Sequence, residues 1–142
     1  MKIESELQKL TTCEQEKDLG ITFDNKLNFD IHIGTIIKKA NQMLGIIKRT
    51  FDHLDKNTFV NLYKALVRSH LEYGNTVWSP HLKRQSIAIE KVQRRATKIV
   101  PGCRNMSYEY RLQYLKLYSL KGRRYWIQRG FNPGIQNLSW FR

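Results

Sequence analysis

Apolar residues recur at helical spacing over most of the chain after residue 30. The first such segment follows Asp30, a residue type favoured at helix N-caps. Its apolar face consists of Ile33, Ile36, Ile37, Ala40, Met43, Leu44, Ile47 and Phe51. Gly34 and Gly45 each disfavour a helix by up to about 1 kcal/mol relative to alanine. We therefore expect a helix that is held by packing of its apolar face.

A second helix is predicted after a break at residues 52–56, with Asp55 as its cap. Its apolar face consists of Phe59, Leu62, Tyr63, Leu66, Val67 and Leu71. We expect this helix to continue to about residue 73, because Gly74 then loosens it. Tyr63, Tyr73 and Trp78 could stack on nucleic-acid bases. Aromatic residues spaced among leucines are more often core residues, and we predict that role for all three.

A third helix is predicted over residues 80–100. Ser79 followed by Pro80 is a strong start signal, and Pro101 with Gly102 is a usual end. One side of the helix is apolar, with Ile89, Val92, Ala96 and Ile99 at helical spacing. A neighbouring side, called here the cationic face, carries Lys91, Arg94, Arg95 and Lys98 at positions i, i+3, i+4 and i+7. One side can therefore pack on a core while the other meets a negatively charged partner.

The two ends of the chain show shorter patterns. Residues 3–12 and 17–23 are predicted strands, joined by residues 12–16 and followed by a turn at Asp24 and Asn25. Near the other end, short helices are expected over residues 107–115, with Ser107 as the cap, and over residues 119–129. The predicted fold is mainly α, with a short N-terminal β-hairpin followed by a helical bundle. We divide the chain into a hairpin (1–28), a helical domain (29–120) and a basic, poorly ordered tail (121–142).

Charge is spread unevenly along the 142 residues, whose formal net charge is +13. Residues 1–30 hold seven acidic and four basic residues, a net −3, while the remaining 21 basic and five acidic residues give +16. An excess of this size repels itself unless a partner offsets it. We therefore expect a polyanion, and nucleic acid in particular, as the partner of the C-terminal part. The alternative is a solvated basic surface.

Other classes of function receive little support from the sequence. No apolar run approaches the roughly 18 residues that span a bilayer, and the N-terminus lacks the apolar core of a secretory signal. Two cysteines, Cys13 and Cys103, are too few for a disulfide framework, and Cys103 is expected to be a free structural cysteine. The four histidines have no zinc-ligand spacing. We expect an intracellular protein, nuclear or cytoplasmic, without a metal or cofactor.

Four strings in the chain resemble one family. KDLGITFDNKLNFDIHI, KANQMLGIIKRTF, LYKALVRSHLEYGNTVWSP and IEKVQRRATKIVPG, the last followed by SYEYRL, are similar to the region after the polymerase palm in reverse transcriptases of non-LTR retrotransposons of the jockey and CR1 kind. The resemblance spans about residues 16–120. It implies that the hairpin is the last part of the palm and that the helices are the thumb, which holds the template–primer duplex. Arg94, Arg95 and Lys98 would then face a nucleic-acid backbone.

The chain also departs from this family. Members usually continue with a pattern like RRxRGD, whereas Arg123 and Arg124 are followed here by Tyr125 and Trp126. The family's catalytic centre needs an adjacent aspartate pair and a third carboxylate to hold two magnesium ions. No two aspartates are adjacent in this sequence; they are Asp18, Asp24, Asp30, Asp52 and Asp55. We therefore expect no catalytic residue and no enzymatic activity from the isolated chain.

Three hypotheses for function follow. The first is a thumb fragment of a retrotransposon RNA-directed DNA polymerase, which binds the duplex through its backbone and whose further partners are the missing palm and fingers. The second is a small nucleic-acid-binding protein domesticated from such an element. The third is a helical interaction module whose basic face binds an acidic protein. The predicted nucleic-acid-binding residues are Lys38, Lys39, Arg84, Lys91, Arg94, Arg95 and Lys98.

Overall fold

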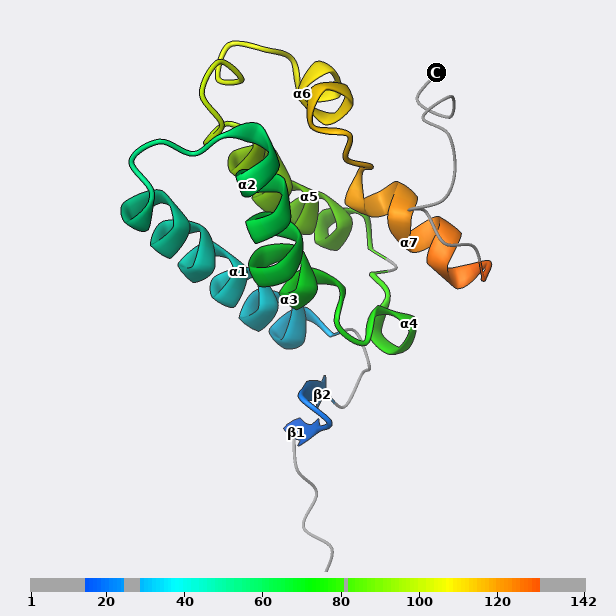
Figure 1. Ribbon diagram of the computed structural model, residues 1–142. Helices are drawn as coiled ribbons and strands as arrows, with labels where there is room; N and C mark the ends of the chain where they lie inside the picture. The colour runs from blue at the N-terminus through cyan, green and yellow to red at the C-terminus, as the bar shows by residue number, and fades with distance from the viewer. Residues whose placement is uncertain (1–14, 25–28, 81, 131–142) are drawn as a thin grey trace, which may run out of the picture.

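The computed structural model describes residues 15–24, 29–80 and 82–130. This part of the chain is mainly helical and begins with a two-stranded hairpin, which confirms the predicted fold class (Figure 1). The elements are β1 (Gln15–Asp18), β2 (Ile21–Asp24), α1 (Asp30–Thr50), α2 (Lys56–Leu62), the π-helical η1 (Tyr63–Arg68), α3 (Ser69–Glu72), α4 (Asn75–Trp78), α5 (Lys83–Thr97), α6 (Tyr108–Leu115) and α7 (Leu120–Gln128).

The hairpin differs in register from the prediction. β1 and β2 pair antiparallel, with Asp18 opposite Ile21, so the turn consists of Leu19 and Gly20. Both turn residues have positive φ, 49° and 82°, which is the two-residue turn that suits the twist of a hairpin. The predicted strand over residues 17–23 was therefore wrong, because a turn lies in its middle. The other predicted strand, residues 3–12, lies outside the described residues.

The helices form two layers. α1 and α5 lie side by side in one layer, and the continuous helix made of α2, η1 and α3 packs across α1. Asp30 accepts a hydrogen bond from Arg84, and Asn41 accepts one from Arg95; both pairs are 54 residues apart in sequence. The same sequence separation therefore occurs at two contacts that lie three helical turns apart, which requires α1 and α5 to run parallel.

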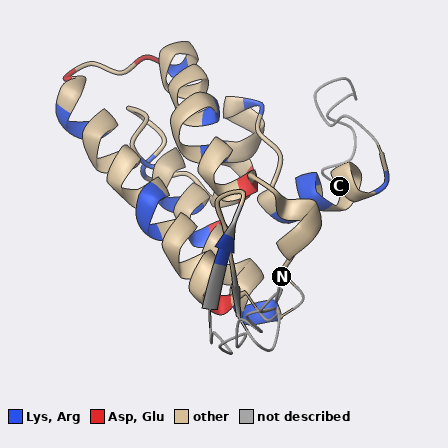
Figure 2. Cartoon of the chain, turned by 90° about the horizontal axis from the view of Figure 1, so that it is seen from below, with Lys and Arg blue, Asp and Glu red and all other residues tan. Residues whose placement is uncertain are grey.

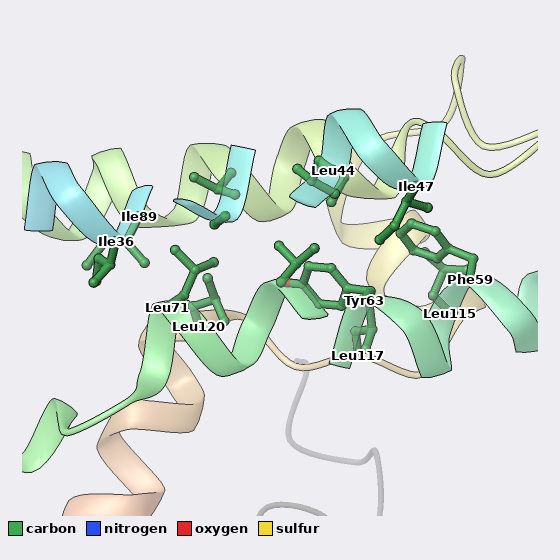
Figure 3. Packing of buried hydrophobic residues seen from close by; sticks show 14 of the residues in the cluster. Ile36, Leu44, Ile47, Phe59, Tyr63, Leu71, Ile89, Leu115, Leu117 and Leu120 are labelled. Carbon is green, nitrogen blue, oxygen red and sulfur yellow. The ribbon is translucent and has the colours of Figure 1, made fainter. Parts of the chain in front are cut away.

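The hydrophobic core lies between these layers. Ile36, Leu44 and Ile47 of α1 point toward side chains of the α2–η1–α3 helix (Figure 3). Their main partners there are Phe59, Tyr63 and Leu71, each fully buried. Leu115, Leu117 and Leu120 close the core from the C-terminal part. Burying one such side chain stabilises the fold by roughly 1.5–3 kcal/mol, so the apolar faces seen in the sequence hold the helices together.

Two predicted helix caps are confirmed, and the structure adds a third. Asp55 accepts a hydrogen bond from the backbone N–H of Thr58 at 3.2 Å, at the start of α2. Ser107 accepts one from Tyr110 at the start of α6. Ser119, which was not predicted as a cap, accepts one from Gly122 at the start of α7. Each cap satisfies a donor that the helix itself leaves unpaired.

Two predicted helix starts were wrong. Phe29, in the left-handed conformation, occupies the N-cap position of α1, and Asp30 is already inside the helix. The Asp30 carboxylate instead accepts hydrogen bonds from Arg84 and Gln85, both at 2.7 Å. α5 begins at Lys83 rather than Pro80, and it ends at Thr97 rather than at residue 100. The Asp30 carboxylate is thus used in a contact between α1 and α5, which local signals do not indicate.

The helical body extends beyond the predicted boundary at residue 120. α7 packs against α5, with Leu120 fully buried and Arg124 only 5% exposed. Residues 121–128 therefore belong to the body and not to a tail, while residues 131–142 lie outside the described residues. Among the aromatic residues, Tyr63 and Trp78 are fully buried as predicted. Tyr73 is 58% exposed, so its predicted core position was wrong.

Candidate nucleic-acid interface

The sequence of α5 separates two sides of the helix clearly. Its buried side carries Gln85, Ile89, Val92, Gln93, Ala96 and Thr97. Its opposite side is exposed and carries basic residues along the whole length of the helix and at its C-cap. They are Lys83, Arg84, Lys91, Arg94, Arg95 and Lys98. The predicted cationic face is therefore exposed, because the apolar stripe beside it is what packs against the core.

The acidic residue of α5 is turned away from the cationic face. Glu90 accepts hydrogen bonds from the backbone N–H groups of Leu120 and Lys121, at 3.3 and 3.2 Å. It also accepts a hydrogen bond from the Tyr108 hydroxyl. A carboxylate is favourable at the N-terminus of a helix, here α7. The charge of Glu90 is thus used within the fold, and the exposed side of α5 keeps its positive potential.

The three arginines of this region also have contacts within the protein. The Arg84 guanidinium forms an ion pair with Asp30 at 2.7 Å, although the Arg84 side chain stays 68% exposed. Arg94 lies over the Tyr108 ring, 4.1 Å from its centroid. Arg95 donates to Asn41 on α1 at 3.0 Å. These contacts orient the arginines, and they mean that replacing one also removes a packing or helix–helix interaction.

Lys91 and Lys98 differ from the arginines. Both are exposed, and neither side chain has a hydrogen bond or an ion pair with another residue of the described ranges. Seven residues on a helix correspond to about 10 Å along its axis, and both residues lie on the same side. Their ammonium groups are therefore available to contact an external anion.

The structure separates the two predicted lysines of α1. Lys38 is exposed and lies one turn before Asn41, the residue that contacts α5, so it extends the cationic face across the α1–α5 contact. Lys39 lies about 100° further around the helix. It is close enough to His32 to help lower the pKa of that buried imidazole. Lys39 is thus not part of the surface that Lys38 shares with α5.

Basic residues are not confined to α5. Lysine and arginine occur on helices on several sides of the molecule, whereas acidic residues are few (Figure 2). What distinguishes α5 is that its exposed cations are closely spaced and that its one carboxylate, on Glu90, is hydrogen-bonded to the start of α7. We therefore place the candidate interface on the exposed side of α5 and the adjoining edge of α1.

Sequence analysis missed a buried polar network under this surface. Gln93 is fully buried; its Oε1 accepts from the Tyr63 hydroxyl at 2.6 Å, and its Nε2 donates to the Tyr108 hydroxyl and the Tyr118 carbonyl, each at 2.9 Å. Burial raises the pKa of both phenols, and the Glu90 carboxylate adds to the rise at Tyr108. The signal in the sequence was Gln93 itself, a polar residue among the apolar positions of its helix. The network fixes α5 against η1 and α6.

Two further observations concern site chemistry. Within the described ranges, no group of three or more histidine, cysteine, aspartate or glutamate side chains is placed to hold a metal ion. Cys103 is a free and fully buried cysteine, as predicted, and burial raises the pKa of its thiol.

None of the described helices is both long enough and apolar enough to cross a bilayer.

Comparison with known proteins finds one relevant similarity. The chain is 27% identical over 121 residues to an uncharacterized protein of Caenorhabditis elegans, which covers 83% of this chain. The chain spans about three fifths of the length of that relative, since the match covers 61% of it. No family model matches the chain, and no solved structure matches it.

Proposed function

We propose that this chain binds nucleic acid as a thumb-like region of a non-LTR retrotransposon reverse transcriptase. Its helices hold the template–primer duplex and leave the chemistry to a palm that this chain does not contain. The observation that carries the proposal is the exposed side of α5, where basic residues follow one another and the one carboxylate points into the fold. The resemblance of the sequence around this helix to that family agrees with the same role.

The side chains involved favour contact with the nucleic-acid backbone. Lysine and arginine contacts to phosphates position a protein on a duplex but carry no sequence information by themselves. Arg84, Arg94 and Arg95 are held by contacts to their own protein, which presents them in fixed directions. We therefore propose that binding depends on charge and duplex shape and is insensitive to base sequence.

Replacing Lys91 and Lys98 together by glutamine tests this proposal. The two substitutions remove two charges and no hydrogen bond within the described residues, and glutamine keeps the helix propensity. Each phosphate contact contributes about 0.9 to the slope of log affinity against log salt concentration on duplex DNA. We expect the slope to fall by roughly 1–2 units and the affinity to fall equally for unrelated sequences. Binding of an RNA–DNA hybrid and of duplex DNA is measured at several salt concentrations.

The matched control replaces Lys64 and Lys116 by glutamine. These exposed lysines, on η1 and directly after α6, give the same change in net charge away from α5. An equal loss of slope in both double variants would show that only net charge matters, and the interface on α5 would be abandoned. A polyglutamate peptide serves as the second ligand. Tighter binding of this peptide than of either duplex would support the alternative, a module that binds an acidic protein.

A further inference from the structure

A pocket of about 800 Å³ opens between α5, α6 and α7. This volume lies within the roughly 300–1,000 Å³ that is typical of small-molecule sites. Much of its wall is apolar, formed by Pro80, Leu82, Ile87, Leu112 and Tyr125. Ile87 is 47% exposed and Tyr125 is 48% exposed. The Arg129 guanidinium lies over one face of the Tyr125 ring, 4.3 Å from its centroid, and the rest of both side chains presents apolar surface that the fold leaves uncovered.

Arg124 lies in the wall of this pocket with only 5% of its surface exposed. Its guanidinium has five N–H donors. It donates one hydrogen bond, to the Ser86 hydroxyl at 2.8 Å, and forms no ion pair with a carboxylate of the described ranges. A buried cation is costly unless it is paired. Burial lowers the pKa of Arg124, and the nearby carboxylates of Glu90 and Glu72 offset only part of this effect. An anion in the pocket would add a directly hydrogen-bonded partner for its remaining N–H donors.

The remaining charges of the pocket also favour an anion. Lys83, Arg94 and Lys121 line it together with Arg124, against two carboxylates. One of these, Glu90, already accepts hydrogen bonds from Tyr108 and from the start of α7. Glu109 is the other. The pocket therefore combines an excess of positive charge with an apolar wall, which suits an anion that carries a flat apolar group.

We propose that this pocket binds a nucleotide, with its phosphate on Arg124 and its base against the apolar wall at Ile87 and Tyr125. The nucleotide is either free or an unpaired residue of a nucleic-acid strand; the second source rests on the proposed function. Arg94 connects the two surfaces, because it belongs to the cationic face of α5 and also lines the pocket. A strand that follows α5 thus reaches the mouth of the pocket at Arg94.

Calorimetric titration with adenosine monophosphate tests the pocket directly, with adenosine and inorganic phosphate as separate probes. We expect the nucleotide to bind at least about tenfold more tightly than either half, because only the nucleotide uses both the arginine and the apolar wall. Ile87→Trp fills the pocket without changing charge and is expected to weaken nucleotide binding by about tenfold or more. Ile46→Trp is the matched control on α1: Ile46 is 45% exposed and does not line the pocket.

Arg124→Gln is the second variant and removes the proposed phosphate partner. It too is expected to weaken binding by about tenfold or more, with folding checked by circular dichroism. No measurable binding of adenosine monophosphate by the wild type, or binding that Ile87→Trp leaves unchanged, would overturn the proposal.

Duplexes with and without a single-stranded 3′ overhang distinguish the two sources of the nucleotide. Tighter binding of the overhang, lost in Ile87→Trp, would identify an unpaired strand nucleotide as the ligand. Binding of the monophosphate without any gain from the overhang would identify a free nucleotide. The blunt duplex reports on the cationic face alone. If the wild-type protein binds adenosine monophosphate but no blunt duplex, the proposed function is rejected and the pocket assignment stands.

Discussion

His32 shows how one side chain couples the hairpin to the helices. It is 2% exposed, and its Nδ1 accepts a hydrogen bond from the Thr22 backbone N–H of β2 at 3.3 Å. Its ring also meets the Trp78 ring edge-on, with centroids 5.2 Å apart. An imidazole that accepts at Nδ1 from a backbone donor is neutral, with its proton on Nε2. Burial, assisted by the nearby Lys39 ammonium, lowers the pKa of His32 from its usual value near 6.5.

This lowered pKa predicts a loss of stability in mild acid. Below about pH 6.5 the unfolded chain binds a proton at His32 and the folded chain does not, so the free energy of unfolding falls with falling pH. The loss continues until the lower folded-state pKa is reached. Urea unfolding between pH 7.5 and 5 measures it in the wild type and in His32→Phe, in which we expect a weaker pH dependence. His70→Gln, at a partly exposed position of α3, serves as the control and should retain the wild-type pH dependence. If wild type and His32→Phe lose the same stability between pH 7.5 and 5, His32 is not the source of the loss.

At the scale of residues, periodicity predicts exposure but not partners. The helical spacing of the sequence indicates correctly that Arg94 and Arg95 point away from the core of α5. It does not indicate that Arg95 contacts Asn41 or that Asp30 pairs with Arg84, since each partner is 54 residues away. Contacts over such separations depend on how the helices are arranged, which a local pattern does not encode.

Glycines show how the same residue type has opposite effects in different elements. Gly45 lies inside α1, and a Cβ atom added there would meet nothing within 4 Å. Gly74 precedes α4 with φ +66°, and an added Cβ would lie 2.6 Å from Ile21 Cδ1 of the hairpin. Gly74 therefore permits both a left-handed turn and the close approach of β2 to the helices. The hairpin is further held by the Tyr73 hydroxyl, which donates to the Leu19 carbonyl at 2.9 Å.

Alanine substitutions at these two positions are expected to differ in sign. Gly45→Ala should raise the free energy of unfolding by up to about 1 kcal/mol, because alanine is the better helix former. Gly74→Ala should lower it by about 1–3 kcal/mol from backbone strain, with a further loss from displacement of Ile21. Equilibrium unfolding in urea measures both. A Gly74→Ala protein as stable as the wild type would show that the hairpin does not dock on this turn.

At the scale of elements, local signals predicted what local interactions determine. The caps at Asp55 and Ser107 were predicted because each depends on contacts within four residues. The hairpin turn was misplaced because Leu19, Ile21 and Phe23 alternate across it as they would along one strand. The π-helical turn of η1 was not predicted, because the apolar spacing on either side of it is still helical.

At the scale of the whole molecule, the charge distribution is the property that most constrains function. The mainly helical bundle follows from the apolar faces, and its fold class could be predicted from them. The cationic face of α5 could be located in the same way. The pocket between α5, α6 and α7 could not, because its walls come from three helices that are separated in sequence, and Arg124 was assigned to a tail.

The net charge of +13 also predicts how the protein responds to salt and to a polyanion. Self-repulsion destabilises a compact, strongly charged chain, and salt screens it. In the absence of a ligand, we therefore expect the melting temperature to rise between 20 and 300 mM salt. A ligand that binds only the folded state stabilises it by about 2.7 kcal/mol at 100 times its dissociation constant. An RNA–DNA hybrid should thus raise the melting temperature by several degrees at low salt, and this shift should shrink as salt increases.

The double variant of Lys91 and Lys98 distinguishes a specific interface from general attraction in this experiment. Neither lysine side chain has a hydrogen bond or an ion pair with other described residues, so the variant should melt at or slightly above the wild-type temperature without ligand. It should gain less stability from the hybrid, because the two proposed phosphate contacts are removed. The control variant of Lys64 and Lys116 should keep the full gain. If all three proteins gain equally from the hybrid, binding follows overall charge, and α5 has no special role in it.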